Sequence, residues 1–430
     1  MSFDIIVRNA TLPDGKKADI GISRGLIEAV ETRLDADAAE IFDAKNCLAS
    51  PPFVDAHFHM DATLSYGIPR INKSGTLLEG IALWGELKPL LTPEAVMERA
   101  LAYCDWAVSM GLLAIRTHVD ICDDRLLAVD ALLEVRRKVA SYIDLQLVAF
   151  PQDGFYRSPS ARDNTLRALD RGVDVVGGIP HFERTMEDGR ASVRELCTIA
   201  SDRGLLVDMH CDETDDPLSR HIETLTAETR RLGLSGRVAG SHLTSMHSMD
   251  NYYVSKLLPL MAEAGIAAIP NPLINIVIQG RHDTYPKRRG MTRVPELARH
   301  GIALAFGQDC VLDPWYPLGA ADMLDVAFMG LHVAQMTSPE DMRRCYDFVT
   351  VEPARIMGLK GYGLNKGSLA SLVVLQAADP VEAIRLRATR LLVISKGKIV
   401  SRMPEHSAQL NLPGRPKTID RRHRTPIENN

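Results

Sequence analysis

The chain has 430 residues, of which 46% are hydrophobic and 24% are charged. This balance is typical of a globular protein and excludes disorder, collagen or a coiled coil as the main architecture. Fifty Lys and Arg residues against fifty-five Asp and Glu residues give a formal net charge of −5. A mildly acidic chain has no global electrostatic reason to bind nucleic acid or an anionic membrane. We therefore expect a small-molecule ligand and neither of those partners.

The seven cysteines are an odd number and include no Cys-x-x-Cys pair, which argues against a disulfide framework and against a cysteine-based zinc ribbon. The N-terminus lacks a basic segment followed by an apolar one, and no stretch of ~18 residues is apolar without a charge or a Pro. We predict a cytoplasmic protein that is neither secreted nor membrane-spanning. We also expect it to form a homo-oligomer.

The two ends of the chain share a pattern of short β-rich runs separated by turn signals. The runs cover 4–7, 18–22 and 26–30 at one end, and 372–375 and 391–394 at the other. Each end is too short to bury a core by itself. We predict that residues 1–50 and 361–412 join into one small, discontinuous β-sandwich domain. Residues 413–430, which are rich in Pro and charge, are expected to form a disordered or loosely packed tail.

Residues 51–360 repeat a different pattern, in which a short apolar run ends in polar residues and precedes a helix-like amphipathic stretch. The runs cover 53–59, 112–120, 144–150, 173–181, 205–213, 237–244, 266–272 and 302–309. Apolar strands that alternate with helices indicate a parallel sheet covered on both faces. Eight of them over about 250 residues predict an α/β fold with a (β/α)8 TIM-type barrel. The alternative is an open doubly wound sheet, which favours a Gly-rich turn where this chain has His-Phe-His.

Polar residues of this region fall at the C-terminal ends of the apolar runs. In chain order they are His57 and His59, His118 and Asp120, Gln152, His181, His210 and Glu213, His242, and Asp309. The C-terminal strand ends of a barrel form one face, and barrel enzymes have their active sites there. We therefore expect these side chains to converge at the mouth of the barrel.

A metal site is predicted among these residues. His57 and His59 are two residues apart, so on a strand their side chains share a face and can bind one ion. With His210 and Asp309 they make three imidazoles and one carboxylate, which suit Zn²⁺ or Fe²⁺ better than Ca²⁺ or Mg²⁺. Two-metal barrel hydrolases often use a modified Lys at the end of the fourth strand, and the fourth run here contains no Lys. We therefore expect one ion.

Two further residues predict hydrolytic chemistry. Glu213 lies three residues after His210, close enough to reach a substrate atom beside the ion without binding the ion, which is the position of a proton shuttle. His242 can hydrogen-bond the attacking water or the oxyanion that it becomes. A bound divalent ion lowers the pKa of its water to roughly 7 and so supplies hydroxide at neutral pH. We predict hydrolysis at a planar, electrophilic C–N carbon. The His-x-Glu and Pro-Cys-x-x-Cys signature of the zinc nucleoside deaminases is missing, which excludes that unrelated fold.

Several blocks of the chain resemble the bacterial cytosine deaminases of the amidohydrolase superfamily. They are PPFVDAHFHMD (51–61), SGTLLEGIALW (74–84), RTHVD (116–120), AFPQDG (149–154), DMHCDE (208–213), NPLINIVIQGRHDTYPKRRGMTR (271–293) and FGQDCVLDPWYPLG (306–319). They cover the predicted barrel in order, and the FPQ, GRHDTYPKRRG and DPWYPLG segments are more specific than any single metal motif. The flanking β domain is also a feature of that superfamily.

The resemblance implies that the four metal ligands named above hold a single ion, usually Fe²⁺ and alternatively Zn²⁺. It implies that Glu213 protonates the ring nitrogen next to the attacked carbon and passes a proton to the departing ammonia. His242 and Asp309 would hold and deprotonate the nucleophilic water. Gln152 would read the pyrimidine carbonyl and the adjacent N–H, since an amide both donates and accepts. Trp315 would form a wall of the pocket. The implied reaction is deamination of a free pyrimidine base at C4.

Two positions depart from the family pattern. Gln308 stands where the family has His, and Cys310 stands where it has an Asp that faces the edge of the pyrimidine ring. Burying a methyl group against a solvated carboxylate is unfavourable, whereas Cys behaves as a small, soft hydrophobe. We predict that the substrates are cytosine, 5-methylcytosine or both, giving uracil or thymine plus ammonia.

Other functions are compatible with parts of this predicted site. A related barrel could remove an alkylamine from a triazine, deaminate an isocytosine- or isoguanine-type base, or open a cyclic amide with the same ion and Glu213. Assays of cytosine against those compounds separate these enzymes. A barrel that only binds a base would bind tightly without releasing ammonia, and the presence of both Glu213 and His242 disfavours it.

Overall fold

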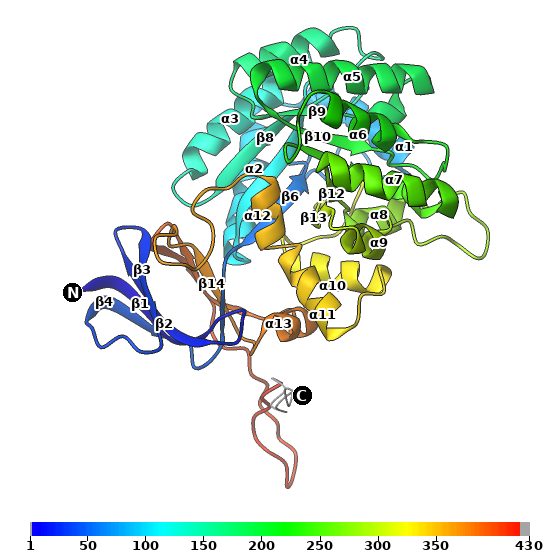
Figure 1. The fold of residues 1–430 in the computed structure, drawn as a ribbon. Helices are drawn as coiled ribbons and strands as arrows, with labels where there is room; N and C mark the ends of the chain where they lie inside the picture. Colours follow the sequence, from blue (N-terminus) through cyan, green and yellow to red (C-terminus); the bar gives the residue numbers. More distant parts are fainter. Residues whose placement is uncertain (1, 422–430) are drawn as a thin grey trace.

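The computed structural model describes residues 2–421, and their strands form two eight-stranded sheets (Figure 1). One sheet is parallel and comes from the central part of the chain. The other takes its strands from both ends of the chain. The predicted α/β fold class is therefore confirmed, with a barrel-type sheet and a separate smaller β unit. Residues 413–421 are exposed, and the part of the predicted tail from 422 to 430 lies outside the described residues.

The parallel sheet forms the barrel. Its strands are β6 (Phe53–Phe58), β7 (Leu112–Asp120), β8 (Asp144–Phe150), β9 (Val175–Gly178), β10 (Leu206–Cys211), β11 (Val238–His242), β12 (Ala267–Ile269) and β13 (Ala303–Leu304). They pair in chain order from β6 to β13. An isolated parallel bridge between Phe58 and Asp309 joins the segment after β13 to β6. The first strand and the chain after the last strand are therefore neighbours, as a closed barrel requires.

Helices follow the strands and cover the outside of the sheet (Figure 1). They are α1 (Leu77–Leu87), α2 (Pro93–Ser109), α3 (Leu127–Val139), α4 (Ala161–Asp170), α5 (Met186–Arg203), α6 (His221–Arg231), α7 (Asn251–Ala264), α8 (Pro272–Ile278), α9 (Val294–Arg299), α10 (Met323–Val333), α11 (Pro339–Asp347) and α12 (Val351–Ile356). The residue immediately before the helix caps several of them: the side chains of Thr92, Thr185, Asp250 and Asp322 each accept a hydrogen bond from a backbone N–H of the following turn. Such caps satisfy donors that have no partner inside the helix.

The second sheet joins the two ends of the chain. Its order is β16 (Lys398–Arg402), β15 (Arg390–Ser395), β14 (Leu372–Leu375), β5 (Leu48–Ser50), β1 (Phe3–Thr11), β2 (Lys17–Ser23) and β3 (Leu26–Glu31), with β4 (Ala38–Asp43) paired to β1. The antiparallel pairing of β14 with β5 connects the late strands to the early ones. The short helix α13 (Pro380–Leu386) lies between β14 and β15. The β5 strand leads directly into β6, so this sheet is attached to the first strand of the barrel.

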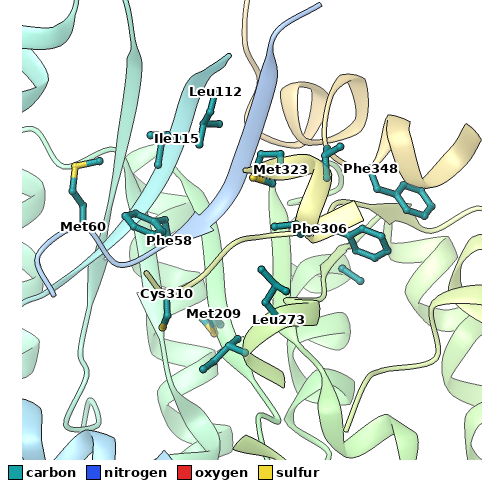
Figure 2. Close-up of a cluster of buried hydrophobic side chains, with 14 of the residues drawn as sticks. Phe58, Met60, Leu112, Ile115, Met209, Leu273, Phe306, Cys310, Met323 and Phe348 are labelled. Atoms are coloured by element: carbon teal, nitrogen blue, oxygen red, sulfur yellow. The ribbon is translucent and has the colours of Figure 1, made fainter. Parts of the chain in front are cut away.

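A large hydrophobic cluster fills the space between the barrel strands and the helices and extends to Val373 and Val393 of the terminal sheet. Figure 2 shows part of it, and the labelled side chains include Phe58 of β6, Leu112 and Ile115 of β7, Met209 of β10, and Cys310. Cys310 is therefore a member of this cluster, and its thiol also contacts the buried carboxyl group of Asp313. Among residues 2–421, none of the helices has the length and hydrophobicity that a membrane span requires.

A buried ion pair connects the terminal sheet to the barrel, and its removal is our first prediction. Arg390 of β15 bonds both carboxylate oxygens of Asp322, the residue that caps α10. Replacing Arg390 by Met should lower the free energy of unfolding by about 3–5 kcal/mol, because the Asp322 carboxylate stays buried without its cation. Urea unfolding measures the change.

The matched control is Arg402→Met, because Arg402 pairs with Glu40 on the surface and exposed pairs contribute only about 0–1 kcal/mol. Equal effects of the two substitutions would contradict the structural role of the buried pair.

Candidate active site

The candidate site lies at the C-terminal ends of the barrel strands. Most of the predicted residues line one cavity there, together with apolar side chains from α1 and α8. The lining residues are His59, Leu77, Gln152, Ile179, His210, Glu213, His242, Ile274, Ile278, Asp309, Cys310 and Trp315. His57 does not line this cavity: it is completely buried, and its ring centroid lies 5.5 Å from that of His59, which does. The structure therefore brings together all of the residues that the sequence predicted as ligands, catalytic groups or substrate contacts.

Three imidazoles and one carboxylate converge at the centre of the site. His59 Nε2 lies 2.9 Å from His210 Nε2. Asp309 Oδ1 lies 3.5 Å from His57 Nε2 and 3.3 Å from His59 Nε2. Nitrogen and oxygen atoms at these separations can surround a single divalent ion.

The residues present fit a metal ion. His57 Nε2 is buried and has no hydrogen-bond partner among the described residues, which is the state expected of a lone pair reserved for a ligand bond. Two overlapping groups of buried donors are close enough to hold an ion, and both contain His57 and His210. One group adds His59 and His118, and the other adds His242 and Asp309. The site can therefore hold a divalent metal ion, as the sequence predicted.

The backbone at two of these residues is strained. His242 has φ of 68° and Asp309 has φ of 66°, in the left-handed region that non-glycine residues rarely adopt. Such a conformation costs about 1–3 kcal/mol per residue and persists where the surrounding structure requires it. Each residue ends or follows a barrel strand, so the left-handed turn directs its side chain into the mouth.

Burial and nearby charges give the two carboxyl groups of the site different pKa values. Burial alone would raise the pKa of Asp309, but the imidazoles of His242, His57 and His59 outweigh it and hold that pKa well below its usual value. Glu213 is equally buried, and both burial and the nearby charge of Asp309 raise its pKa well above the usual value. The shifts therefore favour an anionic Asp309 and a protonated Glu213, which gives the two groups different chemistry within one pocket.

His242 lies between these carboxyl groups. Its Nδ1 is 3.3 Å from Glu213 Oε1, and its Nε2 is 3.8 Å from Asp309 Oδ2. Asn275 Nδ2 donates to His242 Nδ1 at 2.9 Å, and the orientation of that amide is set because its oxygen accepts from the backbone N–H of Asn271. Nδ1 is thus an acceptor, so the neutral imidazole carries its proton on Nε2. Burial lowers the pKa of His242 well below its usual value, which favours this neutral form.

Gln152 and Trp315 define the outer part of the cavity. Gln152 follows β8 and is buried, and among residues 2–421 its side-chain amide forms no hydrogen bond with the protein, so it is free to meet a ligand. The ring centroid of Trp315 lies 6.2 Å from that of His59 and 6.1 Å from that of Trp84 of α1. The Trp315 backbone N–H donates to Asp313, whose carboxyl is buried. Burial raises the pKa of Asp313 to about 7.

Several groups important to this site were missed by sequence reasoning. Asn275 and Asp313 lie inside the blocks that carry the family resemblance, but their contacts could not be derived from the sequence. Asp120, predicted among the groups of the mouth, instead accepts a hydrogen bond from the Trp84 indole and pairs with Lys88. It therefore anchors α1, the helix that contributes Leu77 to the cavity.

The other predicted polar residues occupy supporting positions. His118 is fully buried, and its ring centroid lies 4.1 Å from that of His57, with the two ring planes tilted by 38°. Gln308 is also buried, and its backbone N–H donates to Asp55. Asp55 also accepts from the backbone N–H of His57, and burial raises its pKa to about 8. Asp55 therefore links the first barrel strand to the segment that carries Asp309.

Comparisons with known proteins identify a family and several similar proteins. Residues 40–401 match the amidohydrolase family. A crystal structure of 5-methylcytosine deaminase from Klebsiella pneumoniae liganded with 5-fluorocytosine is similar with a TM-score of 0.92 and 42% identity, covering 95% of this chain and 100% of that chain. N-isopropylammelide isopropyl amidohydrolase from Pseudomonas sp. (strain ADP) is 30% identical over 93% of this chain and 97% of its own length. Pterin deaminase from Rhizobium rhizogenes is 28% identical over 91% of this chain and 89% of its own length.

The chain belongs to the amidohydrolase family. The family resemblance inferred from the sequence blocks is therefore confirmed. The protein is an enzyme, a hydrolase that acts on carbon–nitrogen bonds. The relatives differ in the compounds that they are named for, so the substrate of this chain is a separate question.

The contact between α1 and Trp315 gives a second prediction. Gly80 packs so closely on Trp315 that a Cβ atom would overlap the indole ring. Gly80→Ala should therefore displace Trp315 and lower kcat/KM, by a factor on the order of 10–10² for a misplaced pocket wall. Steady-state kinetics measure the effect.

Gly85→Ala is the matched control, because Gly85 lies on the same helix with open space around its Cα. Both substitutions raise helix propensity, by about 1 kcal/mol at most. If the two variants have the same kinetics, the Gly80–Trp315 contact does not shape the pocket.

Proposed function

We propose that the enzyme hydrolytically deaminates a free pyrimidine base, cytosine, 5-methylcytosine or both, to uracil or thymine plus ammonia. The observation that carries the proposal is the placement of Glu213, a buried carboxyl group with raised pKa, in one cavity with the metal donors. Deamination at a ring carbon needs an acid that can protonate first a ring nitrogen and then the leaving amine. The similarity to a 5-methylcytosine deaminase over nearly the whole chain supports the same reaction.

The proposed ligands of a single divalent ion are His57, His59, His210 and Asp309, with Fe²⁺ favoured by the family resemblance and Zn²⁺ as the alternative. When bound, such an ion lowers the pKa of a water molecule to roughly 7. The chemistry of the donor set supports this choice, because imidazole nitrogens suit both metals.

Residues of the chain supply the proton transfers. His242 holds the nucleophilic water through its Nε2–H, and the Asp309 carboxylate accepts the proton that the water loses. As the new C4–O bond forms, Glu213 donates its proton to the adjacent ring nitrogen. The deprotonated Glu213 then takes the remaining proton of the new C4–OH group and passes it to the exocyclic nitrogen as the C4–N bond breaks, so that ammonia leaves and the ring carries a carbonyl at C4. The proton held by Asp309 finally returns to Glu213, which restores the starting state.

Gln152, Trp315 and Cys310 orient the base. The amide of Gln152 can accept from a ring N–H and donate to the neighbouring carbonyl, which distinguishes the pyrimidine edge. Trp315 offers an aromatic wall on which a planar ring can stack. Cys310 is 3% exposed and part of the hydrophobic cluster (Figure 2), so the edge of the ring that it faces can carry a methyl group.

A second candidate function is removal of an alkylamine from a triazine, favoured by the 30% identity to N-isopropylammelide isopropyl amidohydrolase. A panel assay separates the two. Metal-loaded protein is incubated with cytosine, 5-methylcytosine, isocytosine, N-isopropylammelide and pterin, and the released ammonia or isopropylamine is measured. Ammonia from the two cytosines and one metal ion per chain are expected. Turnover of N-isopropylammelide alone would overturn the proposal in favour of the second candidate.

Glu213→Gln tests the role of the acid. The amide keeps the size of the side chain but cannot donate the carboxyl proton, so kcat should fall by a factor on the order of 10²–10⁴. Metal content should remain unchanged, because Glu213 is not a proposed ligand. Kinetics and elemental analysis give the two readouts, and loss of the metal in this variant would show that the assigned role is wrong.

Cys310→Asp tests the specificity. A carboxylate at this position cannot be buried against a methyl group without losing its water. The preference for 5-methylcytosine over cytosine, measured as the ratio of kcat/KM values, should therefore fall by about 10–200-fold, the range that one methyl group in a pocket provides.

Cys310→Ala is the control, because it keeps the position small and apolar, and it should retain the preference. An unchanged ratio in Cys310→Asp, or rejection of 5-methylcytosine by the native enzyme, would contradict this assignment of Cys310.

A further inference from the structure

A polar layer lies inside the barrel directly below the metal donors. Arg116 of β7 and Asp208 of β10 each precede a histidine of the site by two residues, so their side chains share its face of the strand and point into the barrel. Ser241 of β11 lies beside His210 in the parallel register. All three residues are at most 1% exposed. The interiors of such barrels are usually filled by Val, Ile and Leu. A buried layer of Arg, Asp and Ser is therefore unusual and points to a role other than core packing.

Hydrogen bonds connect this layer to His57. Ser241 Oγ donates to Asp208 Oδ1 at 2.6 Å, and His57 Nδ1 lies 2.9 Å from the same hydroxyl oxygen. Arg116 Nη1 donates to Asp208 Oδ2 at 2.9 Å. The Asp208 carboxylate therefore receives one hydrogen bond on each oxygen and acts as the acceptor of both.

The direction of these bonds determines the tautomer of His57. A serine hydroxyl has one proton, and Ser241 gives it to Asp208. The oxygen of Ser241 can then only accept from His57, so Nδ1 of His57 must carry the proton. The other ring nitrogen, Nε2, keeps its lone pair and is the atom that lies 3.5 Å from Asp309 Oδ1 without a hydrogen-bond partner among the described residues.

Further hydrogen bonds fix Arg116, the member of the layer that lies farthest from His57 along this chain of contacts. Arg116 Nε donates to Gln146 Oε1 at 2.7 Å, and Arg116 Nη2 donates to the backbone oxygen of Ile356 at 3.3 Å. The guanidinium group is thus fixed by three separate elements of the barrel, β8, β10 and the end of α12. It cannot rotate away from Asp208 without losing these bonds.

Stability alone does not explain a buried ion pair at this place. Desolvation of two charges offsets most of their attraction, and well-packed hydrophobic residues often replace such pairs without loss of stability. Metal-ligating histidines, in contrast, commonly donate their second nitrogen to an acceptor that sets ring orientation and tautomer.

We propose that Ser241, Asp208 and Arg116 are positioning residues that hold His57 in the Nδ1–H tautomer, with Nε2 directed at the divalent ion. The inference rests on the proposed role of His57 as a ligand and is independent of the substrate. Ser241 is the closest member and contacts the ring directly, whereas Asp208 and Arg116 act through it.

Ser241→Ala removes the acceptor of the His57 proton while leaving every proposed ligand in place. The affinity for Zn²⁺, measured by competition with a chromophoric chelator, should fall by about 10–100-fold. Ser192→Ala is the matched control: Ser192 is also buried and donates to a backbone oxygen, that of Gly189 on α5, but it contacts no proposed ligand. An effect of Ser241→Ala no larger than that of Ser192→Ala would overturn the inference.

A measurement on the native protein avoids dependence on the folding of the variant. Nitrogen NMR of ¹⁵N-histidine-labelled, Zn²⁺-loaded protein should assign the proton of His57 to Nδ1, and a proton on Nε2 would overturn the inference. Failure of the native protein to bind Zn²⁺ or Fe²⁺ would instead overturn the proposed metal site and the inference with it. Metal binding that is unaffected by Ser241→Ala overturns the inference alone.

Discussion

Two backbone hydrogen bonds at the closure of the barrel control the position of the site. The N–H of His59 donates to the carbonyl of Asp309 at 3.0 Å, and the N–H of Asp309 donates to the carbonyl of His57 at 2.8 Å. These bonds tie the chain after the last strand to the first strand. They also set the distance between the His-x-His pair and the carboxylate, so the geometry that completes the barrel is the same geometry that gathers three of the four proposed ligands. Asp55 reinforces it through its bonds to the N–H groups of Gln308 and His57.

The surroundings of each acid determine its chemistry once the barrel is closed. Asp309 and Glu213 are both completely enclosed, yet only Asp309 is close to several imidazoles. Its negative charge is therefore stabilised, whereas Glu213 has only His242 beside it among the described imidazoles, and burial and the charge of Asp309 raise its pKa. The same fold thus places an anion and a neutral acid in one cavity, with His242 between them.

Much of the fold and the position of the site could be predicted from the sequence, because both depend on local patterns. Apolar runs ending in His or Asp repeat along the chain, and parallel strands bring such ends to one face. The family blocks then added roles that no periodicity indicates, such as the contact of Gln152 with the pyrimidine.

Contacts between distant segments could not be predicted in this way. The hydrogen bond from Asn275 to His242, the attachment of α1 through Asp120 and Lys88, and the packing of Gly80 on Trp315 each join segments that are far apart in sequence. An Asp at a strand end has the same local pattern whether it faces a ligand or supports a helix. Only the packing of α1 shows that Asp120 does the latter.

The pairing of β5 with β14 has a consequence for the order in which the protein is made. Val373 of β14 pairs with Ser50 of β5, and Val374 pairs with Ala49. The partner strand of β5 is therefore synthesised more than 300 residues after β5 itself. Contacts between such distant residues slow folding, because a long loop must close before they form. The terminal sheet can therefore be completed only when nearly all of the chain has been synthesised, and until then the exposed edge of β5 has to be shielded by other means.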